Sequence, residues 1–555
     1  MARSSLALQL LLLLVATFTV VIGTDAPGYV QWSIHKNSEV QSAQIARRSL
    51  ELQGSEGLRA RADSVQVGLG NALPYGLYYA NISVGTPLQV LSVQIDTGSS
   101  DVWIPSSLAE FCAETRSGYP NCIGGSFDED KSTTFTTVQQ PGDFNISYVD
   151  GSGSSGDYFT DTFAIGGATL DNFQMGLALD TDISLGILGI GYNNSEANVY
   201  TGSGTVYANL PFALVDNGII KTEAYSLWLN DLQSADGNVL FGAIDTEKFT
   251  GNLISVDVYP REGSSKISSF TVAFTSLSAT SSSGTDQITP VGYATAAILD
   301  SGTTITLLPD DVASIVFEEL GATVSAQLGA VVVPCSLAEN SGTLNFGFGG
   351  TGGPVIKVAV NDLVLPLTLS SGSTPSYTDG TPACQLGIQA AGELPILFGD
   401  TFLRSAYVVY DLANNKIGMA QTKFNTTDSN IVAFASQGAE IPSAATATQQ
   451  SAVTQSADSS EIPKVGIEPT ALVSDAVPLE TDAEATESFS AAAGFATNAG
   501  SESASSTNLA SGSAETTKKS AGGSGPRPMP VGTMVAAIAT IGGICFGGLA
   551  FQFLI

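Results

Sequence analysis

Two segments of this chain match each other, and this internal repeat restricts the fold more than any other feature of the sequence. Residues 93–105 begin Val-Gln-Ile-Asp-Thr-Gly-Ser-Ser and end at Trp-Ile-Pro, and residues 297–309 begin Ala-Ile-Leu-Asp-Ser-Gly-Thr-Thr and end at Leu-Leu-Pro. Aspartate aligns with aspartate, glycine with glycine and proline with proline. An apolar pair followed by glycine also recurs, at residues 187–189 and 397–399, at a similar distance behind each copy. The duplication predicts two similar lobes, each with one aspartate turn.

The body of the chain, residues 73–424, consists of short apolar and β-branched runs broken by Gly, Asn, Asp and Ser. This is the pattern of an all-β protein. The hydrophobic fraction of 43% supplies enough apolar surface for a large core. We therefore expect an N-terminal lobe over residues 74–250 and a C-terminal lobe over residues 251–424, related by a pseudo-twofold axis and separated by a cleft.

The residues around Asp96 and Asp300 suit acid–base chemistry. An apolar run into each aspartate places its carboxyl group at the end of a buried strand, and the glycine two positions later permits a tight turn. If the lobes bring the two carboxyl groups together, the pair holds one proton over a broad acidic range, because neighbouring like charges resist ionising together. One carboxylate is then a general base for water and the other a general acid. Hydroxyls and turn backbones that can hydrogen-bond this pair come from Thr97, Gly98, Ser99, Ser301, Gly302 and Thr303.

A single Asp-Thr-Gly or Asp-Ser-Gly tripeptide has an alternative interpretation as an ordinary turn, because all of these residues favour turns. Two copies with matching flanks and a repeated apolar-Gly segment argue against that alternative here. We therefore take Asp96 and Asp300 as the candidate catalytic residues.

These motifs resemble those of pepsin-family (A1) aspartic endopeptidases, in particular the fungal candidapepsins and the GPI-anchored yapsins. The resemblance covers residues 78–420 and includes two closing segments, Leu-Phe-Gly-Asp at residues 397–400 and Asp-Leu-Ala-Asn-Asn-Lys-Ile-Gly at residues 411–418. Phe398 replaces a commoner aliphatic residue, which should change packing and leave the aspartates unaffected. The resemblance implies a bilobal all-β fold, peptide or protein substrates, hydrolysis by a water molecule activated between the two aspartates, and no metal or cofactor. The shared proton is an established property of that family's aspartate pair.

Residues 146–152, Ile-Ser-Tyr-Val-Asp-Gly-Ser, alternate in polarity and then reach Asp-Gly, a strong hairpin signal. By the resemblance, this hairpin is the flap that closes over bound peptide and excludes water, and its tyrosine hydrogen-bonds a tryptophan. The alternative is a surface hairpin with a half-buried tyrosine. The residues assigned to the flap and substrate cleft are Tyr148, Asp150, Gly151 and Trp103.

Charge and histidine content exclude several classes of function. The chain has 52 acidic and 20 basic residues, a net charge of −32, whereas a nucleic-acid-binding protein needs a basic face to meet phosphates. The single histidine, His35, argues against histidine-based catalysis and histidine-rich metal sites. The acidic balance suits a protein that works at low pH, where protonation reduces self-repulsion.

Residues 1–23 have the pattern of a secretory signal, in which Arg3 supplies the positive start and an apolar run follows. This run is short and lacks stop-transfer charges, which argues against a membrane anchor. Residues 24–61 are expected to be a propeptide that ends at Arg48 or Arg61, because basic pairs are processing sites for secretory-pathway proteases.

Residues 428–530 are rich in Ser, Thr and Ala, a composition that indicates an O-glycosylated stalk or an unglycosylated flexible linker. Residues 531–555 form an apolar tail with no basic flank behind it. Small residues, a short spacer and this tail fit a GPI-attachment signal, with Gly522 favoured over Ser520 and Gly523 as the attachment residue. The alternative is a plain C-terminal membrane helix. We therefore expect a monomer at the cell surface, held by a GPI lipid in the outer leaflet of the plasma membrane or transferred to the cell wall.

Four of the five cysteines lie between residues 112 and 384. In an oxidising compartment, four cysteines allow two disulfides in three connectivities, although any one of them could instead be a buried thiol. Cys112 and Cys122 are close enough in sequence to close a small loop, which leaves Cys335 with Cys384. A cysteine nucleophile is disfavoured because no histidine follows the expected propeptide to activate it.

Four Asn-x-Ser/Thr sequons are candidate N-glycosylation sites. The first two fall in strand-like stretches near the motifs, which disfavours their occupancy. The four asparagines are Asn81, Asn145, Asn193 and Asn425.

The rival interpretation of the whole chain is a catalytically silent relative that binds peptides or serves as a structural glycoprotein of the cell wall. Loss of either aspartate, or of the glycine that follows it, would indicate this rival. Both triplets are intact.

Overall fold

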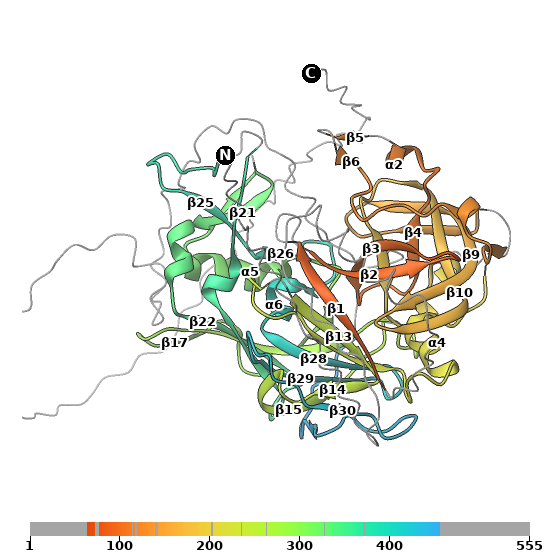
Figure 1. Cartoon of the computed structure of the whole chain (residues 1–555). Coiled ribbons are helices and arrows are strands. Elements are labelled where there is room, and N and C mark those ends of the chain that lie inside the picture. The colour runs from red at the N-terminus through yellow and green to blue at the C-terminus, as the bar shows by residue number, and fades with distance from the viewer. Residues whose placement is uncertain are drawn as a thin grey trace, which may run out of the picture. The chain divides into compact units, whose positions relative to one another are not determined.

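The computed structural model describes residues 64–454, apart from residues 73–76, 114, 117–118, 139–141, 201–203, 235, 262, 327 and 370–372. The predicted signal, propeptide and apolar tail lie outside the described residues, and so do Gly522 and the predicted stalk beyond residue 454. Most of the described elements are strands, which confirms the predicted all-β, bilobal class (Figure 1).

The largest sheet of the described residues joins the two halves of the chain. It places β28, from the end of the body, beside β12 of the first half, and β29 on the other edge of β28. Its strand order is β31 (Ala445–Thr446), β15 (Phe249–Asp257), β29 (Lys416–Thr422), β28 (Ala406–Asp411), β12 (Ala224–Trp228), β13 (Asp236–Phe241), β1 (Val65–Ala72), β2 (Leu77–Val84), β3 (Gln89–Asp96), β11 (Gly186–Gly189), β4 (Val102–Pro105), β10 (Ala168–Thr181), β9 (Gly153–Ile165) and β7 (Thr136–Val138), with β8 (Phe144–Ser147) paired to β9.

The C-terminal lobe contains a second large sheet and a smaller one. The larger has the order β23 (Val355–Ala359), β22 (Thr343–Phe348), β16 (Thr271–Thr280), β18 (Thr295–Leu299), β27 (Leu397–Phe398), β19 (Thr306–Leu308) and β26 (Ile388–Ala390), with β17 (Thr285–Gln287) paired to β16. The smaller has the order β20 (Thr323–Ser325), β21 (Ala330–Pro334), β25 (Ala383–Leu386) and β24 (Val364–Leu365). Two-stranded pairs are formed by β14 (Ala243–Asp245) with β30 (Ile431–Ala433) and by β5 (Thr115–Arg116) with β6 (Tyr119–Pro120).

The helices are short and lie between the strands. None of those within the described residues is long and apolar enough to cross a bilayer. The α-helices are α2 (Glu110–Ala113), α3 (Ala197–Tyr200), α4 (Leu210–Asp216), α5 (Asp310–Leu320) and α6 (Asp400–Leu403), and the 3-10 helices are η2 (Glu129–Lys131), η3 (Asn193–Ser195), η4 (Cys335–Glu339) and η5 (Val360–Leu363).

The sequence duplication appears in the structure as the same three-stranded arrangement in each lobe. In the N-terminal lobe, β11 pairs parallel with β3 and antiparallel with β4. In the C-terminal lobe, β27 pairs parallel with β18 and antiparallel with β19. Each aspartate turn therefore connects the two outer strands of an equivalent unit, β3 to β4 in the N-terminal lobe and β18 to β19 in the C-terminal lobe.

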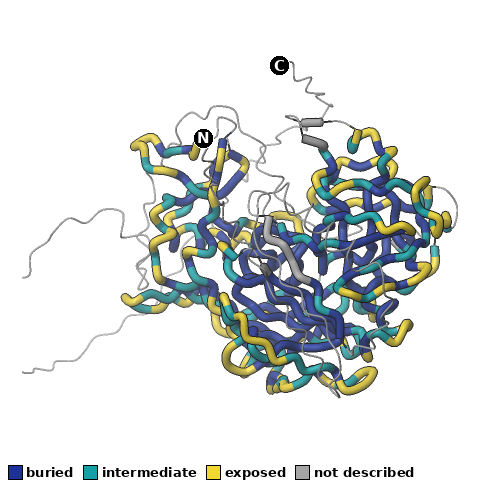
Figure 2. The backbone as a smooth tube through the Cα atoms, in the orientation of Figure 1, coloured by how far each residue is buried: buried dark blue, intermediate teal, exposed yellow. Residues whose placement is uncertain are grey.

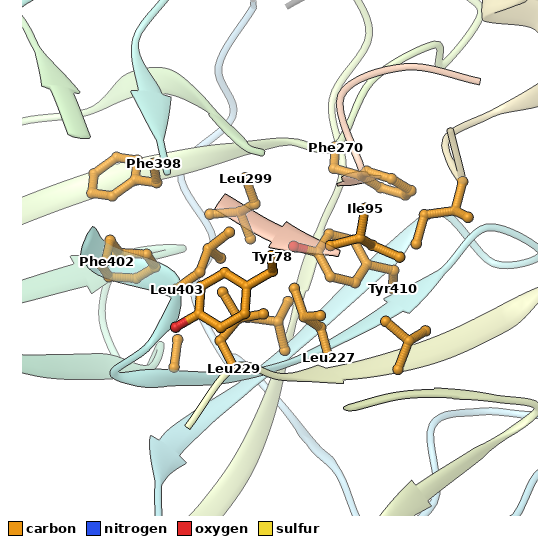
Figure 3. Packing of buried hydrophobic residues seen from close by; sticks show 14 of the residues in the cluster. Tyr78, Ile95, Leu227, Leu229, Phe270, Leu299, Phe398, Phe402, Leu403 and Tyr410 are labelled. Atoms are coloured by element: carbon orange, nitrogen blue, oxygen red, sulfur yellow. The ribbon is translucent and has the colours of Figure 1, made fainter. Parts of the chain in front are cut away.

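Apolar side chains directly before the aspartates anchor the two turns in one core. Ile95 and Leu299 are fully buried and belong to the same cluster as Tyr78, Phe270 and Tyr410 (Figure 3). Figure 2 shows that burial follows the strands, whereas exposed segments are concentrated in connecting loops. Because close packing resists displacement, this core fixes where both turns begin.

Phe398, the aromatic residue at an otherwise aliphatic family position, packs among other phenylalanine rings. Its ring centroid lies 4.8 Å from that of Phe402, 5.1 Å from that of Phe348 and 5.2 Å from that of Phe274. Its backbone carbonyl accepts a hydrogen bond of 3.1 Å from the N–H of Asp300. Phe398 therefore belongs to an aromatic cluster next to the C-terminal turn, and its backbone contact to Asp300 is present.

The predicted start of the N-terminal lobe at residue 74 is wrong. Strand β1 precedes it and pairs antiparallel with both β2 and β13. Its sequence contains two glycines and an asparagine within eight residues, a composition that suggests a loop. Pairing of β1 with a strand on each side stabilises an extended conformation that its own residues do not favour.

The predicted start of the stalk at residue 428 is also wrong. Residues 428–454, which we call the C-terminal strap, pack on the body: β30 pairs with β14, and β31 pairs parallel with β15. Phe434 of the strap is fully buried in a cluster with Trp228 and Tyr407. Composition averaged over the long Ser/Thr/Ala-rich stretch hid these few apolar positions.

Polar contacts hold the first part of the strap as well. The buried carboxylate of Asp245 accepts hydrogen bonds from the Ser429 hydroxyl at 2.7 Å and from the Asn430 N–H at 2.8 Å. Farther along, the Ser451 N–H donates to the carbonyl of Gly349 at 2.9 Å. The strap is therefore part of the folded domain.

We expect Phe434→Ala to lower the free energy of unfolding by about 3–5 kcal/mol, because it removes a fully buried ring and leaves a cavity. Urea denaturation of the purified protein measures this change. Val291→Ala, at a fully exposed apolar residue, is the control and should change the stability little. Equal stability of the two variants would contradict a packed strap.

Candidate active site

The two candidate aspartates sit at corresponding strand ends. Strand β3 ends on Asp96, and β18 ends one residue before Asp300. Both side chains are fully buried. The carbonyl of Asp96 accepts a hydrogen bond of 2.9 Å from the N–H of Ile190, just after β11. In the other lobe, the N–H of Asp300 donates to the carbonyl of Phe398, the last residue of β27. Local strand pairing therefore places both carboxyl groups away from bulk water.

Reciprocal hydrogen bonds cross from one aspartate turn to the other. The Thr97 N–H donates to the Ser301 hydroxyl at 3.2 Å, and the Ser301 N–H donates to the Thr97 hydroxyl at 2.9 Å. The same hydroxyls donate onward, from Thr97 to the Leu299 carbonyl at 3.1 Å and from Ser301 to the Ile95 carbonyl at 3.2 Å. This exchange is symmetric, as expected of two lobes related by a pseudo-twofold axis.

Each carboxyl group accepts one backbone and one hydroxyl hydrogen bond from its own turn. For Asp96, Oδ1 accepts from the Gly98 N–H at 2.8 Å and Oδ2 from the Ser99 hydroxyl at 2.5 Å. The equivalent bonds to Asp300, of 2.9 Å and 2.5 Å, come from Gly302 and Thr303. Two donors on two different oxygens fix the plane of each carboxyl group.

The two carboxyl groups face one shared point beside Gly302. A Cβ atom at Gly302 would overlap Oδ1 of Asp96 and would lie 3.2 Å from Oδ1 of Asp300. Glycine is therefore required there by the close approach of the opposite carboxyl group. The Gln94 amide crosses the same interface and donates to the Gly302 carbonyl at 3.2 Å.

The electrostatics of the pair favour a retained proton. Burial raises the pKa of Asp300 well above its usual range, and the adjacent negative charge of Asp96 raises it further. Hydrogen bonds from Thr303 and Gly302 act in the opposite direction. Two carboxyl groups in this arrangement share a proton, because ionising both would place like charges together in a buried site.

The predicted flap is a hairpin formed by β8 and β9. Its turn is closed by a 2.9 Å hydrogen bond from the Gly151 N–H to the Tyr148 carbonyl, and Gly151 adopts a φ of +83°. Asp150 is exposed at the tip, where its carboxylate accepts from the N–H and hydroxyl of Ser152 at 2.9 and 2.6 Å. The Trp103 indole N–H donates to the buried Tyr148 hydroxyl at 2.8 Å. The charge of Asp96 contributes to the raised pKa of Tyr148, whose main cause is burial, so this hydroxyl lies within electrostatic reach of the aspartates.

The structure forms the disulfides that the sequence favoured, Cys112–Cys122 and Cys335–Cys384, each with Cα atoms 4.9 Å apart. Among the sequons, the side chains of Asn145, on flap strand β8, and Asn425 are exposed. Asn81 and Asn193 are partly buried, and Oδ1 of Asn81 accepts from the Ser92 hydroxyl at 2.8 Å. No group of His, Cys, Asp or Glu suited to hold a metal ion occurs within the part of the chain that the structure describes.

One buried carboxyl group near the site was missed by sequence reasoning. Asp101 lies five residues after Asp96, is fully buried and accepts hydrogen bonds from the hydroxyls of Tyr158 and Tyr207. A signal existed in the repeat itself, because the aligned position of the second copy is Ile305. Among the aligned positions of the two copies, this is the one where an acid faces an aliphatic residue, and such a mismatch indicates a role that only one lobe needs.

Comparison with known proteins agrees with this geometry. The family model of eukaryotic aspartyl protease matches residues 77–422. A protein of Aspergillus oryzae named "Probable aspartic-type endopeptidase" is 38% identical over 421 residues, covering 76% of this chain and 81% of the relative. "Secreted aspartic protease 1" of Candida albicans is 35% identical over 396 residues, covering 70% and 91%. The crystal structure of an aspartic proteinase from Irpex lacteus has the same fold, with a TM-score of 0.51 and 24% identity over 66% of this chain and all of that one.

Proposed function

This chain belongs to the eukaryotic aspartyl protease family and is an aspartic-type endopeptidase, and from that premise we propose that Asp96 and Asp300 are its catalytic pair. The observation that carries the proposal is that two buried carboxyl groups, one from each copy of the repeat, face the same point beside Gly302. The turns that carry the two aspartates are joined by the reciprocal hydrogen bonds between Thr97 and Ser301. Peptide or protein substrates follow from the family.

The proposed reaction is hydrolysis by an activated water molecule, with the pair starting in its singly protonated state. The ionised carboxylate accepts a proton from water as the oxygen attacks the peptide carbonyl carbon, and the protonated carboxyl group gives its proton to the carbonyl oxygen. The resulting geminal diol then collapses: the carboxyl group that took the water proton passes one to the leaving nitrogen, the C–N bond breaks, and a diol hydroxyl returns its proton to the other carboxylate. One proton remains on the pair, so the cycle closes without a metal, a cofactor or a covalent enzyme intermediate.

The flap completes the proposed site. Tyr148, whose hydroxyl accepts from Trp103, belongs to the turn of the hairpin whose tip carries Asp150 and Gly151. Closure of such a hairpin over a peptide excludes water and strengthens the electrostatic field around the aspartates. These four residues are the proposed flap and cleft residues.

An acid pH optimum is part of the proposal. Activity requires one proton on the pair, and burial and Asp96 raise the pKa of Asp300, so the singly protonated form persists through the acid range. The net charge of −32 acts in the same direction, because protonation of surface carboxylates relieves self-repulsion.

We further propose a secreted zymogen that is held at the cell surface. The supporting features are the signal pattern of residues 1–23, the propeptide pattern of residues 24–61 and the GPI-type tail after Gly522. A stalk that begins after residue 454 would carry the monomeric enzyme, with glycans most accessible at Asn145 and Asn425.

Asp96→Asn and Asp300→Asn should each lower kcat/KM for an acid-pH peptide substrate by about 10²–10⁴-fold, because each removes one partner of the acid–base pair while keeping its shape. Asp171→Asn, an exposed residue of β10, is the matched control and should cleave as the wild type does. Cleavage by the wild type should stop with pepstatin. Pepstatin-insensitive activity in the two variants would refute the pair, and a wild-type ectodomain that binds but never cleaves peptides after propeptide removal would favour the silent, peptide-binding rival.

Thr303→Val should move the basic limb of the pH profile of kcat/KM to higher pH. The Thr303 hydroxyl donates to Asp300 Oδ2 at 2.5 Å and lowers the pKa of that carboxyl group, so removing it raises this pKa and the pair keeps its proton to higher pH. Thr303→Ser keeps the donor and should retain the wild-type limb. A limb that stays in place or moves to lower pH in Thr303→Val would contradict the assigned hydrogen bond.

Phosphatidylinositol-specific phospholipase C should release the active enzyme from intact cells that express the full chain, because a GPI lipid is its only proposed attachment. Immunoblotting and peptide cleavage in the medium measure the release. A chain truncated after residue 530 is the control and should appear in the medium without the lipase. Activity that remains with the membrane after lipase treatment would indicate a spanning helix instead.

A further inference from the structure

Asp101 is a fully buried carboxylate that collects three donors from three separate segments. Its Oδ1 accepts from the Tyr158 hydroxyl at 2.7 Å and from the Tyr207 hydroxyl at 2.8 Å. Its Oδ2 accepts from the N–H of Ala197, the first residue of α3, at 2.7 Å. A carboxylate held by three donors is a strong point of attachment, because hydrogen bonds to a charged acceptor are shorter and stronger than neutral ones.

The backbone of Asp101 is hydrogen-bonded to the strand that pairs with β3, which carries Asp96. The Asp101 carbonyl accepts from the N–H of Gly189 at 3.1 Å, at the end of β11, the strand that also pairs with β3. Beside it, the Asn209 amide donates to the Ser100 carbonyl at 3.1 Å. A side chain that is hydrogen-bonded to Asp101 is therefore kept at a fixed position relative to the turn that carries Asp96.

Tyr158 connects this point to the flap. It lies on β9, two residues beyond the part of this strand that pairs with β8, at a position where β9 pairs with β7 and β10. Its ring meets that of Phe144 on β8 edge-on, with centroids 5.4 Å apart. Phe144 lies 6.3 Å from the ring of Trp103, which hydrogen-bonds Tyr148. These residues form a small cluster separate from the main core, so the flap has its own packing unit, and Asp101 is a polar attachment of that unit.

The second copy of the repeat indicates that Asp101 is not needed to form an aspartate turn. Its counterpart, Ile305, is a buried aliphatic residue packed with Ile298 and Leu397. The turn around Asp300 keeps the same backbone and hydroxyl hydrogen bonds as the turn around Asp96 without an acid at this position. A carboxylate in the N-terminal copy therefore serves something outside the turn, and its donor Tyr158 lies on flap strand β9.

A second acid beside this group stays uncharged. Glu196 is fully buried, its Oε2 accepts from the Tyr207 N–H at 2.9 Å, and burial raises its pKa to about 10. It is therefore protonated throughout the acid and neutral range and adds no like charge next to Asp101. Burial raises the pKa of Asp101 as well, whereas the hydrogen bonds from Ala197, Tyr158 and Tyr207 lower it. Three donors therefore favour the ionised form of Asp101, and one donor does so for Glu196.

We propose that Asp101 is a flap-positioning residue, whose buried carboxylate holds the flap strand through the Tyr158 hydroxyl, braced by Tyr207, in a fixed position relative to the turn that carries Asp96. This inference rests on the proposed function of Asp96 and Asp300. It extends that function by assigning the flap's resting position to a group that does not touch the substrate.

The kinetic test is Tyr158→Phe, which removes only the hydroxyl. A flap that is closed for a smaller fraction of the time raises KM by the inverse of that fraction, while bound peptide still closes it at saturation. We expect KM to rise about tenfold, the effect of losing one hydrogen bond to a charged acceptor, with kcat within about twofold of the wild type. The matched control is Tyr407→Phe, which removes a buried hydroxyl that accepts from the Asp245 N–H at 2.7 Å in the sheet joining the lobes. It should lower stability and leave KM unchanged, and an equal rise of KM in both variants would overturn the proposal.

Asp101→Asn tests whether the carboxylate is the partner through which Tyr158 acts. The variant should also raise KM, and the double variant Asp101→Asn with Tyr158→Phe should not exceed the larger single effect, because both remove the same interaction. Additive effects on log KM would overturn the direct link. Tyr158→Phe alone keeps the test decisive if the Asp101 variant does not fold.

A spectroscopic test separates this proposal from the catalytic one. Trp32→Phe with Trp228→Phe leaves Trp103 as the single tryptophan of the chain, inside the flap cluster. In this background Tyr158→Phe should shift the Trp103 emission to longer wavelength, because the loosened flap admits water, and pepstatin should reverse the shift. An unchanged emission would overturn the positioning role. A shifted emission in a protein that cleaves no peptide would leave the positioning role standing and would overturn the catalytic assignment.

Discussion

The reciprocal hydrogen bonds between Thr97 and Ser301 are the contact on which the proposed site depends. They are formed by backbone N–H and side-chain hydroxyl groups of two turns that are more than two hundred residues apart in the chain. Each hydroxyl acts as acceptor and donor at once, so neither turn can shift without breaking bonds in both lobes. Because the two copies of the repeat exchange equivalent hydrogen bonds, the distance between the two aspartates is fixed.

The buried acids are held by donors that orient them without neutralising them. The groups that reach Asp96 and Asp300 within their turns are hydroxyl and backbone N–H groups. A neighbouring ammonium or guanidinium group would trap a carboxylate in its ionised form, whereas neutral donors leave burial to favour a retained proton. Asp101 uses the same kind of donor for a different proposed purpose, since one of its tyrosines, Tyr158, lies on a strand of the flap hairpin. One lobe therefore contains two buried acids with similar partners and separate proposed roles.

The sequence predicted those parts of the molecule that depend on local chemistry or on the repeat. The aspartate turns, the hairpin at Asp150-Gly151 and the favoured cysteine pairing all follow from short motifs and their spacing. Strand β1 and the C-terminal strap were missed because tertiary pairing orders segments whose local composition suggests a loop or a stalk. The role of Asp101 depends on Tyr158 and Tyr207, and nothing in the spacing of these residues along the chain shows that their hydroxyls converge. The sequence feature that indicated a separate role for Asp101 was its alignment with the aliphatic residue Ile305 in the second copy of the repeat.

The C-terminal strap also limits where the chain can be cut between the folded enzyme and the proposed anchor. Its last described backbone bond to the body, from Ser451 to Gly349, comes after a buried phenylalanine and two paired strands. Shedding by a protease that cuts before this point would remove part of the enzyme's own core. Shedding that leaves this core intact therefore has to occur after Ser451, toward the C-terminal side of the last strap contact described.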